Sequence, residues 1–152
     1  MIQIVELRTA GAALAGPLGE FFETLREAGG ERHFHPHPLN REEAEHRIQY
    51  DGPDLYYVLT EDGKVIGYGM LRGWGEGYET PSLGIAIHPS ERGKGLSKLA
   101  MLFLHAAARR RNAERVRLTV DADNTVALKL YRRLGYGFRC LEDGRLEGTV
   151  QL

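Results

Sequence analysis

The residues best suited to chemistry begin with a glycine-rich stretch, Arg92-Gly93-Lys94-Gly95, directly ahead of a long run of helical periodicity. Glycines at such a point let the backbone approach a ligand and direct unpaired N–H groups at it, while the helix dipole adds partial positive charge. Arg92, Lys94 and Lys98 place three cations around the same loop. This combination suits a polyphosphate better than a single carboxylate.

The spacing within this loop excludes two common nucleotide motifs. A dinucleotide fingerprint needs a small residue three positions after its second glycine, and that position holds Lys98. A P-loop needs four residues between its glycines, followed by Lys and Ser or Thr, and that pattern is absent. The pattern present is Arg-x-x-Gly-x-Ser, from Arg92 to Ser97. For the loop alone, a plain strand-to-helix turn stays open.

A second group of candidates lies on the helix predicted after residue 121. Asn124 and Tyr131 are seven residues apart, which is about two helical turns, so both lie on one face. Ala127 lies between them, and its small side chain leaves room for a ligand to pass. Without the glycine loop, Asn124 could be only an N-cap and Tyr131 only a half-buried aromatic.

Two further segments carry polar and aromatic groups. His33, His35 and His37 occupy alternate positions, so they would share one face of an extended chain. No Cys, Asp or Glu follows at a matching spacing, so we expect no metal there; an ordinary loop and acceptor recognition both stay open. The glycine-rich segment 73–79 holds further candidate binding groups or lids on the core. These are Trp74, Glu76, Tyr78 and Glu79.

Hydrophobic periodicity predicts the elements that must position these groups. We expect strands over residues 2–8, 55–60, 65–72, 83–87, 115–121, 136–141 and 145–152, and a loop over 9–16. We expect helices over 18–28, 41–50, 96–111 and 125–134, the second of them capped by Asn40 with Glu43. The predicted buried stripe of the long helix consists of Leu96, Leu99, Ala100, Leu102, Phe103, Ala106 and Ala107.

Length and composition indicate a single domain over residues 1–152. The net charge of -1 gives no reason to expect nucleic acid or an anionic membrane as a partner. The single Cys140 cannot form an internal disulfide, and neither a signal peptide nor a run of about 18 apolar residues is visible. We therefore expect a cytoplasmic protein, a monomer or a homodimer.

Two motifs resemble those of the GNAT superfamily of acyl-CoA N-acyltransferases. The loop resembles Gln/Arg-x-x-Gly-x-Gly/Ala, with Ser97 in place of the final Gly or Ala. The stretch from Asn124 to Tyr136 resembles Asn-x-x-Ala-x-x-Leu-Tyr-x-x-Leu-Gly-Phe/Tyr at every named position. The resemblance extends over essentially the whole chain, although the first fifty residues match only in outline. It implies an α/β GNAT fold: a mixed, mostly antiparallel sheet of about seven strands with about four helices.

The resemblance also implies an N-acetyltransferase that moves an acetyl group from acetyl-CoA to a primary amine by direct attack in a ternary complex. The backbones of Ile85 and Ile87 would bind pantetheine, Asn124 would lie beside the cofactor, and Tyr131 would be both a cofactor contact and the general acid. The pyrophosphate would be held by Arg92, Gly93, Lys94, Gly95, Leu96 and Ser97.

The general base and the acceptor depend on less specific signals. The family often has a glutamate where this chain has Pro81 or Ser82, so Glu79 is the first candidate for the base, ahead of Glu76 and His35. The expected acceptor is a small polar amine, bound by His35, Trp74, Glu76 and Tyr78. Acetylation of a protein N-terminus or lysine is the alternative, and a non-catalytic acyl-CoA-binding module is a second.

Overall fold

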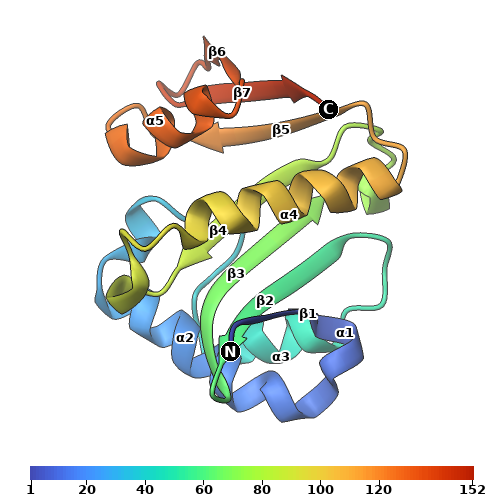
Figure 1. The fold of residues 1–152 in the computed structure, drawn as a ribbon, viewed down its shortest axis with the longest axis vertical. Coiled ribbons are helices and arrows are strands. Elements are labelled where there is room, and N and C mark those ends of the chain that lie inside the picture. The colour runs from blue at the N-terminus through green and yellow to red at the C-terminus, as the bar shows by residue number, and fades with distance from the viewer.

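The computed structural model describes residues 1–152 and contains one seven-stranded sheet in the order β1-β2-β3-β4-β5-β7-β6 (Figure 1). The strands are β1 (Gln3–Glu6), β2 (Leu55–Glu61), β3 (Lys64–Arg72), β4 (Ser82–Ile87), β5 (Arg115–Val120), β6 (Gly137–Cys140) and β7 (Leu146–Gln151). The helices are α1 (Leu7–Ala10), α2 (Ala15–Glu27), α3 (Arg41–Gln49), α4 (Leu96–Arg110) and α5 (Thr125–Arg133). Short 3-10 turns are η1 (Gly11–Leu14), η2 (Gly30–Arg32), η3 (Trp74–Glu76) and η4 (Pro89–Glu91).

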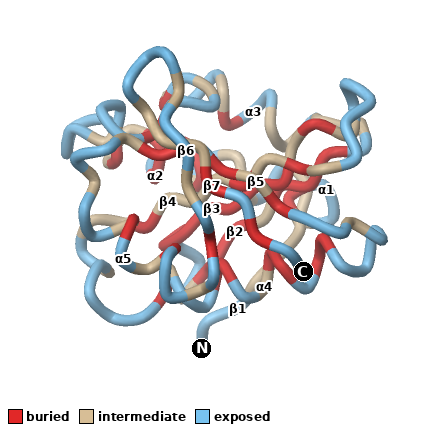
Figure 2. Tube along the Cα trace, turned by 90° about the horizontal axis from the view of Figure 1, so that it is seen from above, coloured by how far each residue is buried: buried red, intermediate tan, exposed pale blue.

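Helices cover both faces of this sheet because β3 alternates its apolar side chains between them. Tyr68 and Met70 belong to the core shared with α2 and α3, whereas Leu71 belongs to the core under α4. Gly69 allows α4 to approach closely, since a Cβ there would lie 3.0 Å from a methyl group of Leu104. Figure 2 shows the buried segments concentrated in the middle strands, with exposed loops around them.

The sheet opens between β4 and β5. These two strands run parallel and pair at one position, Ser82 with Arg117, whereas every other neighbouring pair is antiparallel over at least four positions. Beyond Ser82 the edge of β4 that faces β5 has no ladder partner, so the strands diverge toward their C-terminal ends. Their backbone polar groups are therefore available to a ligand.

The predicted architecture is confirmed: the sheet is mixed and has seven strands, and four helices have nine residues or more. Asn40 begins α3 as expected, accepting the N–H of Glu43 at 2.8 Å. None of the helices combines the length and the apolar composition that crossing a bilayer requires.

The beginning of the chain differs from the prediction. The first strand ends at Glu6 instead of continuing to residue 8, and residues 9–16 are helical rather than a loop. A short apolar alternation does not distinguish the end of a strand from the first turn of a helix. Packing decides here, because Leu7 is only 1% exposed within the core of α2 and α3.

The predicted buried stripe of α4 was also wrong in part. Leu99 is 42% and Leu102 is 49% exposed, and Met101, Leu104 and His105 are buried instead. Leucine and alanine occur all around this helix, so composition alone did not select the face that meets the sheet. The buried His105 is satisfied by the hydroxyl of Tyr136, 2.7 Å from its Nε2.

Candidate active site

A cavity of about 840 Å³ occupies the opening between β4 and β5. Its walls are residues 82–87 of β4 and 117–120 of β5, and the loop before α4, the start and middle of α5 and the segment after α2 complete it. This volume lies in the usual range for small-molecule sites, roughly 300 to 1,000 Å³. Ile85 and Ile87 lie on the β4 wall, at the edge that lacks a ladder partner.

The loop before α4 forms one end of the cavity. Gly93 and Gly95 have φ angles of 77° and 86°, which L side chains rarely adopt, and Gly95 is the N-cap of α4 without any side-chain cap. The N–H groups of the first turn therefore have no side-chain acceptor within the protein. Arg92, Gly93 and Ser97 line the cavity. Lys94 instead binds Glu91 at 3.0 Å.

Two other predicted loop residues do not line the cavity: Gly95 only shapes the turn, and Leu96 is buried in the core beside Ala100. The sequence prediction for this loop treated six consecutive residues alike. A turn with two positive φ angles rotates successive residues to different sides, so only some of them face the opening.

Tyr131 of helix α5 and Asn124, the N-cap of that helix, lie on the opposite side. Tyr131 is 9% exposed, lines the cavity, and makes no hydrogen bond to another protein group through its hydroxyl. Burial raises the pKa of Tyr131 to about 12, so the hydroxyl keeps its proton at neutral pH. Asn124 caps α5, accepting the N–H of Ala127 at 3.4 Å, and also lines the cavity. Asn124 is therefore an N-cap that also faces the cavity.

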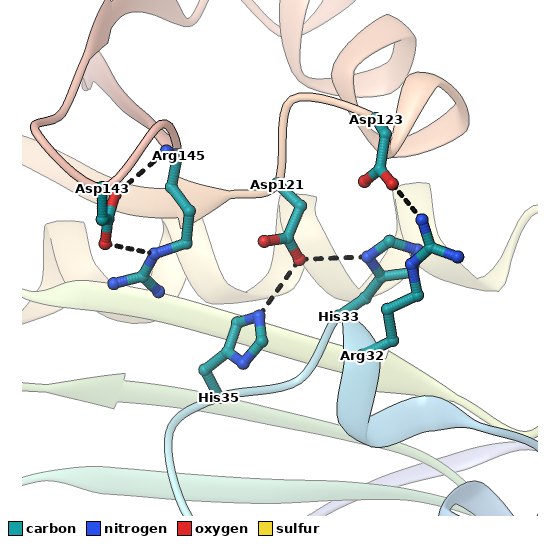
Figure 3. A network of polar contacts seen from close by, with 7 residues as sticks. All are labelled: Arg32, His33, His35, Asp121, Asp123, Asp143 and Arg145. Atoms are coloured by element: carbon teal, nitrogen blue, oxygen red, sulfur yellow. Dashed lines mark hydrogen bonds and ion pairs between the residues drawn. The ribbon is translucent and has the colours of Figure 1, made fainter.

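The histidine segment divides between two environments. Asp121 Oδ2 lies 3.0 Å from His33 Nδ1 and 3.1 Å from His35 Nε2 (Figure 3). Burial alone would raise the pKa of Asp121, but the hydrogen bonds from the two histidines outweigh it and lower that pKa. Arg32 binds Asp123 beside them. These contacts tie the segment after α2 to the loop between β5 and α5, and we call this set the Asp121 bridge.

His37 does not share a face with His33 and His35, contrary to the prediction from their alternation. Its Nδ1 lies 2.7 Å from the carbonyl of Pro38 and its Nε2 lies 2.9 Å from the hydroxyl of Tyr68. Nδ1 must donate to a carbonyl, so Nε2 accepts from the tyrosine. Burial lowers the pKa of His37, which makes it a neutral core residue. The prolines at 36 and 38 explain the difference, because they turn the chain out of a regular extended form.

The segment 73–79 brings one of its four candidates to the cavity. Glu76 lines it, whereas Glu79 is exposed away from it. Trp74 packs against the core with the guanidinium of Arg111 5.1 Å from its ring. Tyr78 is 53% exposed, and its ring lies 5.2 Å from the guanidinium of Arg117.

A family model described as the acetyltransferase (GNAT) family matches residues 20–136, more than half of the chain. The chain belongs to this family. A curated acetyltransferase of Sodalis glossinidius is 27% identical over 92 residues, 60% of this chain and 63% of the relative. The aligned part therefore spans less than two thirds of that relative.

Solved GNAT structures share the fold. The GNAT domain of S. lividans PAT superposes with a TM-score of 0.83 at 17% identity, covering 99% of this chain and 90% of that one. A GCN5-related N-acetyltransferase from Kribbella flavida gives 0.77 at 22% identity, covering 99% and 98%. RimL, a ribosomal L7/L12 α-N-protein acetyltransferase in complex with coenzyme A, gives 0.81 at 14% identity, covering 99% and 94%.

Sequence reasoning missed several polar residues of this GNAT chain, among them Arg72, Arg117 and Asp121. Arg72 and Arg117 line the cavity, and Asp121 anchors the bridge at its edge. None of them lies in a motif, and Arg72 and Arg117 are 45 positions apart. For Arg72 and Asp121 the available signal was a charged residue at the end of a strand, whereas Arg117 lies within β5 and had no such signal. No group of three or more His, Cys, Asp or Glu side chains is arranged to hold a metal ion.

Proposed function

We propose that this protein transfers the acetyl group of acetyl-CoA to the primary amine of a small polar metabolite, by direct attack in a ternary complex. The observation that carries the proposal is one cavity, bounded at one end by the glycine loop before α4 and lined on another side by Tyr131. To bind a nucleotide thioester and transfer its acyl group, a site needs groups that bind phosphate and a proton donor near the sulfur.

The residues present fit acetyl-CoA. Positive-φ glycines, unpaired N–H groups and Arg92 at the start of α4 suit its phosphates. The unpaired edge of β4 at Ile85 and Ile87 suits the amide groups of pantetheine, which need backbone partners in a narrow cleft. Asn124 lies on the facing wall. The donor supplies an activated acyl carbon and a thiolate leaving group.

Tyr131 is the proposed general acid. As the amine nitrogen bonds to the acyl carbon and the C–S bond breaks, the leaving sulfur gains a proton from the phenol, and the phenolate regains one from the nitrogen, which becomes a neutral amide. A thiol has a pKa of about 8.5, so the thiol product keeps its proton near neutral pH. The hydroxyl has no competing hydrogen bond in the protein, which leaves it available for this step.

The acceptor must first lose a proton, because an alkylammonium has a pKa of about 10.4 and is almost fully charged near pH 7. Of the three bases expected from the sequence, Glu76 and His35 line the cavity and Glu79 does not. The proposed general base is therefore Glu76 or His35, and not Glu79. Asp121 holds His35 Nε2, so the other ring nitrogen of His35 is the one left to take a proton.

The Asp121 bridge favours a small acceptor over a peptide. Contacts from Arg32, His33 and His35 join two segments at the edge of the cavity (Figure 3). An extended polypeptide would compete with these contacts at the edge of the cavity, whereas a small metabolite needs only the volume of the cavity itself. Structural relatives include enzymes named for ribosomal protein substrates, but at 14–19% identity their similarity indicates a shared fold and not a shared substrate.

An acceptor screen tests this proposal. Purified protein is mixed with acetyl-CoA and either small amines or short peptides, and free thiol is measured against a control without acceptor. Release with small amines and little with peptides is expected. Faster release with peptides would favour protein acetylation. Tight binding of acetyl-CoA with no thiol release from any acceptor would leave a non-catalytic binding module.

A further inference from the structure

Besides the glycine loop before α4, the cavity wall has a second cationic site, formed by residues in a row across three strands. Arg72 of β3 pairs with Ser82 of β4, and Ser82 pairs with Arg117 of β5. Residues paired directly across neighbouring strands project to the same face of a sheet. The two arginines are thus about 10 Å apart at their Cα atoms, two strand spacings, with a small hydroxyl residue between them. All three residues line the cavity, and we call them the arginine row.

The arginine row faces away from the glycine loop. Met70, two residues before Arg72, packs in the core of α2 and α3, and Arg72 donates to the carbonyl of Pro36 at 2.9 Å. The side chains of β4 alternate in the same way: Leu83 packs under α4, whereas Gly84 lies against Met70. The cavity therefore has a main-chain anion site before α4 and a side-chain cation site on the opposite face of the sheet.

The charges of the arginine row are not neutralised within the protein. Arg32 and Arg145, which also line the cavity, are paired with Asp123 and Asp143 (Figure 3). Arg72 and Arg117 have no carboxylate partner.

The guanidinium groups of the row are nevertheless held in place. Arg72 donates to a carbonyl oxygen, and Arg117 lies over the ring of Tyr78 at 5.2 Å. These contacts fix orientation and leave the positive charge available. Two ordered, half-buried and uncompensated guanidinium groups are suited to an anionic group of a ligand.

One carboxylate lines the same cavity. Glu76 follows Arg72 by four residues, is exposed to the cavity, and forms no ion pair. A molecule with an ammonium group and an anionic group would therefore find a partner for each. The phosphates of the donor are already matched by the α4 end, so the arginine row is left for the acceptor.

We infer that the acceptor is an amine that carries a carboxylate, with the carboxylate bound by Arg72 and Arg117 and the amine directed toward Glu76. This inference rests on the proposed function. It narrows the acceptor from any small polar amine to amino acids and related zwitterions. The neutral amides and the decarboxylated amines of the same compounds should be poor acceptors.

Matched acceptor pairs test the inference. Thiol release is measured with the amino acids, with their carboxamides, and with phosphoethanolamine and ethanolamine. The carboxylate member of the best pair should exceed its amide in kcat/KM by about tenfold or more. A preference for the amides would overturn the inference and leave acetyl transfer intact. A preference for phosphoethanolamine over every carboxylate would replace the carboxylate with a phosphate.

Variants assign the preference to the arginine row. Arg117→Gln and Arg72→Gln should each lower kcat/KM for the best amino acid by roughly 10 to 100-fold, chiefly through KM, and leave the KM for acetyl-CoA unchanged. Arg145→Gln is the matched control, because this cavity arginine is already paired, and its effect should stay within about twofold. Equal losses in all three variants, or an unchanged preference for the carboxylate in Arg117→Gln, would overturn the assignment.

Variants that fail to fold do not obscure this result. Amide turnover by the same preparation reports whether the reaction centre is intact, and only the ratio of carboxylate to amide is interpreted. If no compound in either set releases thiol, the proposed function fails and this inference fails with it.

Discussion

The two cationic ends of the cavity are built in different ways. The glycine loop before α4 is made from the main chain, with positive φ angles at Gly93 and Gly95 and the N–H groups of one helix start. The arginine row is made from side chains, and its members come from three strands. The first end is contiguous in sequence, and the second exists only once the strands are aligned.

Because the two ends are built differently, we expect their ligand binding to respond differently to substitution. A main-chain site tolerates many side-chain changes but fails when a Cβ strains the turn. A side-chain site tolerates backbone adjustments but depends on particular guanidinium groups. Substitutions at one end should therefore change the kinetics of one substrate alone. If both substrates respond to either end, the assignment of donor and acceptor to separate ends is wrong.

The largest effect is expected at Tyr131, which belongs to neither end. Tyr131→Phe removes the proposed proton donor and should slow thiol release by roughly 10 to 1,000-fold while both KM values stay close to those of the wild type. Steady-state measurement with each substrate varied in turn checks this.

Tyr136→Phe is the matched control for Tyr131→Phe. This ring lies 5.8 Å from that of Tyr131, but its hydroxyl bonds to His105 instead of lining the cavity. The control should retain the wild-type rate and lose stability. A wild-type rate in Tyr131→Phe would remove the phenol from the mechanism.

The next largest effect is expected at the main-chain end. Gly95→Ala forces a Cβ onto a φ angle of 86°, a strain of about 1–2 kcal/mol, and distorts the first turn of α4. The KM for acetyl-CoA should rise by roughly tenfold, with little change in the KM of the acceptor. Gly63→Ala controls for strain, because Gly63 has a φ of 79° in the hairpin between β2 and β3, away from the cavity. An equal rise in both variants would mean that general destabilisation causes the effect.

The contrast between the ends also explains what the sequence could predict. The glycine loop, the Asn124 cap and the position of Tyr131 follow from local spacing, because a turn and a helix face are set by neighbours in the chain. The arginine row depends on the alignment of residues 45 positions apart, and the Asp121 bridge depends on hydrogen bonds between residues 86–88 positions apart. No local pattern encodes such a register.

Packing accounts for the predictions that were wrong. His37 alternates with His33 and His35 in sequence, yet it turns into an aromatic core with Phe22, Phe34 and Tyr68. Alternation predicts a shared face only for an extended chain, and the chain here is not extended. In the same way, α4 has apolar residues on several faces, so its sequence alone does not show which face is buried. That face is determined by how the helix packs against the sheet.

A smaller effect is expected at the Asp121 bridge, which covers the acceptor end. Asp121→Asn weakens the contacts to His33 and His35, and the KM of the acceptor should rise about threefold, consistent with an exposed ion pair. The lowered pKa of Asp121 means that its contribution to stability is present above its unfolded pKa, about 3.9, and is lost as pH falls through the folded value.

The melting temperatures of wild type and Asp121→Asn should therefore differ most above pH 5, and the difference should shrink progressively as the pH falls below about 4. A difference that does not shrink as the pH is lowered from 5 through 4 and below would contradict this account of the bridge.

The smallest effect concerns Tyr131 at alkaline pH, where no change is expected. The phenol of Tyr131 must be protonated to act as a proton donor. Because its pKa is about 12, the enzyme should lose activity through this group only as the pH rises through that value. An ordinary phenol with a pKa of about 10 would be half ionised at pH 10, which would halve kcat, whereas a buried one is about 99% protonated. With both substrates saturating, kcat should not fall between pH 9 and 10. A twofold fall centred near pH 10 would mean that water reaches the hydroxyl of Tyr131 in the working complex, despite the burial of this side chain in the structure.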